Sequence, residues 1–122
     1  MSNLKSYRDL EVWKKSIDLV DKIYQLSKTF PPEERFGLTS QIRRAAISIP
    51  ANIAEGAART GTGEFLQFLS VASGSLAEVE TFLVLTQRLK LMPDQTVLEL
   101  EAQAAEISRM LGGLKRSLRS RR

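Results

Sequence analysis

The feature that most constrains this chain is a helical spacing of apolar residues in four successive segments. In each segment, apolar residues recur at steps of three and four, which places them on one face of an α-helix. No segment alternates apolar and polar residues with a period of two over the length of a strand. Amphipathic helices joined by short connections form up-down bundles. The sequence therefore predicts an all-α fold, an up-down-up-down antiparallel four-helix bundle.

We expect one domain over residues 1–122, because a chain of this length can bury one core. The predicted helices cover about 8–29, 34–58, 63–90 and 93–117, followed by a basic tail at 115–122. The residues predicted to face the core are Leu10, Trp13, Ile17, Val20, Tyr24 and Ser27 in the first helix, Ile42, Ala45, Ala46, Ile49 and Ile53 in the second, Phe65, Phe68, Leu69, Ala72, Leu76, Val79, Leu83 and Thr86 in the third, and Val97, Leu100, Ala104, Ile107, Leu111, Leu114 and Leu118 in the fourth.

The second segment contains Pro50 at a position inside the predicted helix. Proline removes a helical hydrogen bond there, at a cost of about 3 kcal/mol. Because the apolar spacing continues past it, we expect a kink or a local widening and not a break. Alanines and Gly56 leave this helix with little bulk, so another helix can approach it closely. Gly74 costs the third helix about 1 kcal/mol relative to alanine, and we expect close contact with the second helix to compensate.

Three charged residues lie beside these small side chains, namely Arg44, Glu55 and Glu78. Arg44 and Glu55 share the polar face of the second helix, and either arginine of the Arg43-Arg44 pair could reach a carboxylate across the helix interface. We interpret the three as a structural ion-pair network that fixes the helix register. A ligand or partner site is the alternative.

The composition excludes the commonest catalytic and metal-binding groups. The chain contains neither histidine nor cysteine, so Ser-His-Asp and Cys-His catalysis and the usual zinc sites are impossible. Carboxylate pairs such as Glu78 and Glu80 are two residues apart and point to different faces of a helix. The sequence predicts no enzyme and no metal site. The absence of cysteine, of a signal sequence and of an apolar run of 18 residues favours a cytoplasmic protein without a membrane partner.

Positive charge gathers at the C-terminus. The last eight residues, KRSLRSRR, hold five of the 18 lysines and arginines and none of the 14 acidic residues, so the remainder has a net charge of −1. Such a tail fits a solvated helix end, a phosphate-contacting segment, or a dock for an acidic protein surface. The predicted nucleic-acid contacts are Lys115, Arg116, Arg119, Arg121 and Arg122, with Arg43, Arg44 and Arg59 behind them. No aromatic residue lies within the tail, so base-specific readout of single strands is not expected there.

Several runs of residues resemble one known protein family. They are DLEVW at 9–13, FP at 30–31, ERFGLTSQIRRA at 34–45, SIPANIAEG at 48–56 and GSLAE at 74–78. With these runs the chain resembles the four-helix-bundle family named for proteins encoded in intervening sequences of bacterial 23S rRNA genes, also called S23 ribosomal proteins. The match covers about residues 6–92, and the run at 48–56 is the most specific part of it.

The resemblance implies an all-α bundle that assembles as a ring-shaped homopentamer, without catalytic activity or a cofactor. It also implies RNA or another nucleic acid as a partner. A related group consists of accessory proteins for the reverse transcriptase of diversity-generating retroelements, which implies a larger protein partner as the alternative. We therefore expect a non-enzymatic homo-oligomer that binds nucleic acid through phosphates, or else a protein-interaction scaffold.

Overall fold

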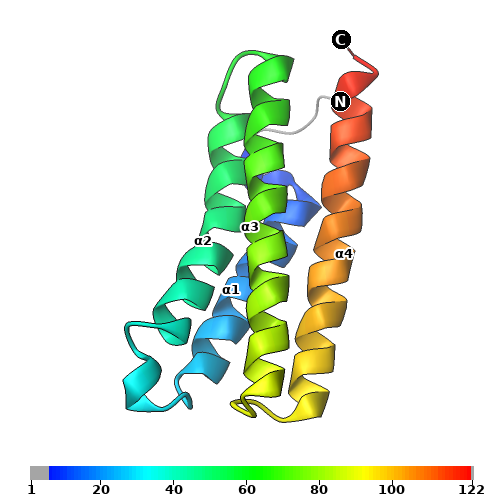
Figure 1. The fold of residues 1–122 in the computed structure, drawn as a ribbon. Coiled ribbons are helices and arrows are strands. Elements are labelled where there is room, and N and C mark those ends of the chain that lie inside the picture. Colours follow the sequence, from blue (N-terminus) through cyan, green and yellow to red (C-terminus); the bar gives the residue numbers. More distant parts are fainter. Residues whose placement is uncertain (1–5, 122) are drawn as a thin grey trace.

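The structure is a computed structural model that describes residues 6–121. Four long helices, α1 (Glu11–Ser27), α2 (Leu38–Ala57), α3 (Thr62–Arg88) and α4 (Asp94–Arg119), make up most of the chain, with short 3₁₀ turns η1 (Tyr7–Asp9) and η2 (Pro32–Glu34). The described residues contain no strand. Each helix packs against two neighbours, in the cyclic order α1, α2, α3, α4. The chain reverses direction at each connection (Figure 1), so the predicted four-helix bundle is confirmed.

The core faces of three helices match the sequence pattern. All five residues predicted for α2 are buried, and so are six of the eight in α3 and six of the seven in α4. In α1 the prediction is confirmed in part, because Ser27 is buried and Leu10, Trp13 and Val20 are half-buried against the core. Val12, Leu19 and Ile23 form its buried face, whereas Ile17 is exposed. The apolar residues of α1 cover two adjacent stripes, and spacing alone does not decide which stripe faces the core.

Ser6 and Asp9 form a capping box at the start of the described residues. Ser6 Oγ accepts from the backbone N–H of Arg8 at 3.0 Å, and the Asp9 carboxylate accepts from the backbone N–H of Ser6 at 3.3 Å. These bonds close η1, and the extended backbone at Leu10 separates η1 from α1. The first helix therefore begins at Glu11, three residues after the predicted start.

Helix α2 continues through Pro50 without a break, as predicted, and Pro50 is buried. The close approach of α3 occurs at Gly56 and not at Gly74. A Cβ atom added to Gly56 would lie 2.8 Å from Phe68 Cβ and 2.9 Å from Phe65 Cδ1, whereas one added to Gly74 would meet nothing within 4 Å. The expectation that contact with α2 compensates Gly74 is wrong, because Gly74 faces away from the bundle.

The outer surface of α3 is unusually apolar. By length and composition α3 could cross a membrane, and 33% of its most apolar stretch is buried inside the bundle. Val71, Val84 and Leu85 are among its exposed side chains. Glu78 and Glu80 interrupt the apolar sequence of α3, so the helix contains no unbroken apolar run of 18 residues. Helices in the core of soluble proteins share this composition, and the absence of a membrane partner stays a prediction.

Candidate nucleic-acid interface

The basic C-terminal segment is part of α4 and not a separate tail. The helix runs to Arg119, and Leu118 is buried in the core. Cations are favourable in the last turn of a helix because they face the negative end of its dipole. Arg116, Arg119 and Arg121 are exposed around this helix end, while Arg122 lies outside the described residues. The predicted basic tail is therefore largely helical, since α4 extends through Arg119.

Lys115 differs from the arginines around it. Its Nζ donates a 2.7 Å hydrogen bond to Ser73 Oγ on α3, and the side chain is half-buried. Burial, followed by the positive charge of Arg119, lowers the pKa of Lys115 below its ordinary value of 10.5. Lys115 thus ties α4 to α3 and is less available to a phosphate than its neighbours.

One further cation belongs to this surface. Arg109 is exposed and lies seven residues before Arg116, so the two share a face of α4. From Ile107 to Arg121 the chain contains five basic residues and no acidic one. The sequence prediction missed Arg109 because it treated the basic segment as a tail that begins at residue 115. The helical period was the signal that could have found it.

The predicted arginines of α2 separate into two groups. Arg59 follows the end of α2, where its Nη2 lies 3.1 Å from Glu55 Oε2 and its guanidinium lies 4.9 Å from the Phe68 ring centroid. The turn between α2 and α3 is at the same end of the bundle as the C-terminus (Figure 1). Arg43 and Arg44 lie in the first half of α2, toward the opposite end. The eight predicted contacts therefore do not form one surface.

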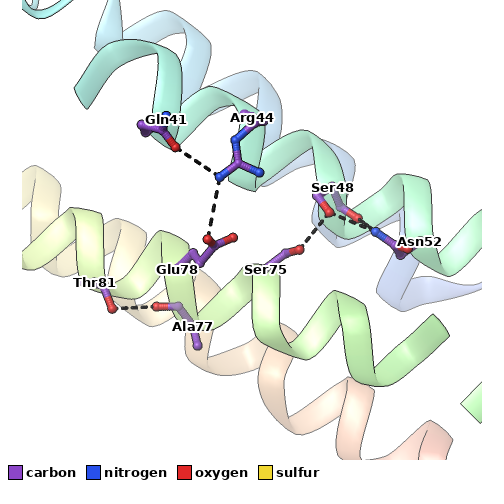
Figure 2. Close-up of polar contacts among 8 residues, drawn as sticks. All are labelled: Gln41, Arg44, Ser48, Asn52, Ser75, Ala77, Glu78 and Thr81. Carbon is purple, nitrogen blue, oxygen red and sulfur yellow. Dashed lines mark hydrogen bonds and ion pairs between the residues drawn. The ribbon is translucent and has the colours of Figure 1, made fainter. Parts of the chain in front are cut away.

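The predicted ion-pair network is also divided. Arg44 Nη2 lies 3.6 Å from Glu78 Oε2 and donates to Gln41 Oε1 at 3.1 Å (Figure 2). Glu55 pairs with Arg59 instead, because Arg44 and Glu55 are 11 residues apart, about 16 Å along the helix. The Arg44 and Glu78 side chains are 58% and 48% exposed. The pair is therefore a surface ion pair and not a partly buried network.

A cluster of hydroxyl and amide groups occupies the α2–α3 interface instead. Ser75 Oγ donates to Ser48 Oγ at 2.7 Å, and Asn52 Nδ2 donates to the same oxygen at 2.9 Å (Figure 2). Asn52 Nδ2 also lies 2.7 Å from the Ser48 carbonyl oxygen. Ser75 is buried, and the other two residues are half-buried. These directional bonds between small side chains fix the register of the two helices.

Other parts of the structure offer little chemistry. No three acidic side chains within residues 6–121 gather closely enough to hold a metal ion. A hollow of about 330 Å³ between α1 and α4 is lined by Lys22, Glu99 and Gln103. Gln103 Oε1 is buried there without a partner in the described part of the protein. This arrangement does not include a nucleophile paired with a base.

The fold and these surfaces define a class of protein, an all-α bundle with a basic helix end. Residues 8–113 match the family described as 23S rRNA-intervening sequence protein, and the chain belongs to that family. A solved structure from the S23 ribosomal protein family, a protein with unknown function from Bacteroides thetaiotaomicron VPI-5482, is 27% identical. The match covers 85% of this chain and 97% of that one, with a TM-score of 0.79. No curated protein matches the sequence.

Proposed function

We propose that this protein is a non-enzymatic, cytoplasmic homo-oligomer that binds RNA or another nucleic acid through phosphate contacts at the end of α4. The observation that carries the proposal is the run from Ile107 to Arg121, which has five basic residues and no acidic one, four of the five on α4 and the fifth just after its end. Because no acidic residue is interspersed in this run, its positive charges reinforce one another and favour a polyanion. The family name refers to an element of a ribosomal RNA gene, which agrees with a nucleic-acid partner.

Self-association strengthens this proposal. The exposed Val71, Val84 and Leu85 side chains give α3 an apolar outer surface, and contacts between copies would remove such a surface from water. A ring, which the family resemblance implies to be a pentamer, would present the basic helix end once per copy. Linked sites raise the overall affinity well above that of one site. Light scattering during size exclusion measures the number of copies.

The test is a salt titration of binding to structured RNA, duplex DNA and single strands. Deleting residues 115–122 would also remove the buried Leu118 and the bond from Lys115 to Ser73. A triple variant, Arg116→Gln, Arg119→Gln and Arg121→Gln, removes the charge and leaves the core intact. For each phosphate that the variant no longer contacts on duplex DNA, the slope of log affinity against log salt should fall by about 0.9.

The matched control removes three exposed cations elsewhere, with Lys14→Gln, Lys22→Gln and Arg88→Gln. Both triple variants have the same net charge, so a loss of affinity confined to the α4 variant would identify the helix end as the contact. Equal affinities and slopes for the two variants would contradict the proposal.

A protein-interaction scaffold is the second candidate, and the same apolar face of α3 favours it. A larger protein with an apolar docking face would cover these side chains. Capture of partners with and without nuclease treatment separates the two functions. A partner that remains bound after nuclease treatment and contacts α3 would support the scaffold.

A further inference from the structure

A second positively charged surface lies on the half of the bundle away from the C-terminus (Figure 1). It is an open groove of about 460 Å³ between the end of α1, the η2 connection and the start of α2. Three arginines and two aromatic residues line it, together with smaller side chains; they are Arg35, Arg43, Arg44, Tyr24 and Phe36. We call this surface the Arg–aromatic groove.

Phe36 is the most exposed large apolar side chain of residues 6–121, at 84%. It lies in the connection before α2, outside the helical core. The guanidinium of Arg35 lies 5.0 Å from the centre of its ring. An isolated exposed apolar residue is ordinary, but here the ring lies in a groove beside cations. One face of such a ring offers a platform for another planar group.

The side chain of Arg43 is fixed by contacts with α1. Its Nε donates to Ser27 Oγ at 2.7 Å, its Nη2 lies 3.5 Å from the Tyr24 carbonyl oxygen, and its guanidinium lies 4.6 Å from the Tyr24 ring centroid. These contacts fix the side chain and use Nε and Nη2, so the two Nη1 donors remain for a bound group. An ordered guanidinium loses less entropy on binding a phosphate than a free one.

The charges of the groove are only partly neutralised. Arg44 pairs with Glu78, whereas Arg35 and Arg43 have no carboxylate partner within residues 6–121. A neighbouring hollow of about 290 Å³ shares Arg35 and Arg43 with the groove and adds Lys28. Together the two hollows give a continuous basic path, and a chain of phosphates could follow it.

We propose that the Arg–aromatic groove binds single-stranded nucleic acid, with phosphates on Arg35 and Arg43 and an unpaired base stacked on Phe36. This inference rests on the proposed nucleic-acid function. It adds a second binding site and specifies that this site binds a single strand. In a duplex the bases stack on each other, so only an unpaired base can offer its face to an exposed ring. An acidic peptide would use the arginines but would have no need of the ring. The C-terminal basic segment contains no aromatic residue, and the groove supplies the ring that this segment lacks.

The experiment measures anisotropy of a labelled oligouridine of about 12 nucleotides, within the usual site sizes of about 4–16, and of a duplex RNA of equal length. The full chain is compared with Phe36→Ala, Phe36→Trp and the double variant Arg35→Gln, Arg43→Gln. Leu98→Ala is the matched control, since Leu98 is another exposed apolar residue and lies outside the groove, on α4. Thermal unfolding and oligomeric state are recorded for each variant.

We expect Phe36→Ala to weaken single-strand binding by about 5- to 150-fold, the range for loss of one stacked base. Phe36→Trp should retain the affinity, and duplex binding should not change in either variant. The double arginine variant should reduce the salt slope for the single strand by about 0.7 for each phosphate that it no longer contacts. Leu98→Ala should resemble the wild type, and the Phe36 and Leu98 variants should share the wild-type melting temperature because both side chains are exposed. The double arginine variant should melt at a lower temperature, because Arg43 bonds to the buried Ser27 on α1.

Two results would overturn the inference in different ways. If the wild type binds no nucleic acid, both the proposed function and the groove assignment fail. If it binds but Phe36→Ala keeps the full single-strand affinity, only the groove assignment fails. A change of oligomeric state in Phe36→Ala with unchanged affinity would assign the ring to a contact between copies and would also reject the inference.

Discussion

The close approach of α2 and α3 at Gly56 gives the sharpest stability prediction. In Gly56→Ala, the new Cβ would lie 2.8 Å from Phe68 Cβ and 2.9 Å from Phe65 Cδ1. Both distances are far below van der Waals contact, and Phe68 Cβ is fixed to the backbone, so the helices must move apart. Overpacking of this kind costs about 1–3 kcal/mol. The better helix propensity of alanine returns less than about 1 kcal/mol, because Gly56 lies next to the end of the helix.

Gly74→Ala provides the matched comparison. The substitution is the same, but the added methyl group would meet nothing within 4 Å. Gly74 lies in the middle of α3, so the variant should gain up to about 1 kcal/mol. The two variants should therefore differ by about 1–4 kcal/mol in free energy of unfolding.

Urea denaturation at one fixed protein concentration measures this difference, with the oligomeric state checked for each variant. Reducing Phe65 to leucine in the Gly56→Ala background should recover part of the loss. If Gly56→Ala were as stable as Gly74→Ala, the helix approach described at Gly56 would be wrong. A Gly74→Ala variant that lost stability together with self-association would place the outer face of α3 in an interface between copies.

Three further predictions concern polar groups. Ser75→Ala should lower the free energy of unfolding by about 1 kcal/mol, since it removes the bond to Ser48 inside the α2–α3 interface; urea denaturation measures it. Glu78→Gln should change it by less than about 1 kcal/mol, because the pair with Arg44 is exposed, and a double-mutant cycle that gave a larger coupling would contradict the geometry. The pKa of Lys115 is lower in the folded state than the ordinary value of 10.5 that applies to the unfolded chain. At pH values between these two pKa values, Lys115 is protonated in a larger fraction of unfolded molecules than of folded ones. Stability from this residue should therefore rise with pH through that window, and Lys115→Gln should lose the rise in pH-dependent unfolding curves.

The sequence predicted the fold because each helix carries its own period. Ile49, Ile53 and Gly56 stand at steps of four and three, so the position of Gly56 on the core face was already present in the pattern. Gly74 lies two residues from both Ala72 and Leu76, which places it on the opposite side of the helix. The prediction for Gly74 was wrong because it considered only that the residue is small, and not which face of the helix it occupies.

The polar contacts were much less predictable. Long charged side chains at one face of a helix have several possible partners, and the choice depends on how neighbouring helices are staggered. Arg44 pairs with Glu78 on α3, whereas Glu55 pairs with Arg59, four residues further along the chain. The Arg–aromatic groove depends on the path of the connection between α1 and α2. That path brings Arg35 and Phe36 next to Tyr24 and Arg43, and no local spacing encodes it.

The two basic surfaces must act independently if both proposals hold. Helix α3 has 27 residues and sets a long axis of about 40 Å, and the surfaces lie toward opposite ends of that axis (Figure 1). Screening in physiological salt reduces electrostatic interactions beyond about 8 Å, so charge removed at one surface should not alter the other. Distant sites normally show additive free energies. For a single strand long enough to contact both surfaces at once, affinity should therefore fall by the product of the two separate factors when the α4 and Phe36 variants are combined, whereas duplex affinity should respond to the α4 variant alone.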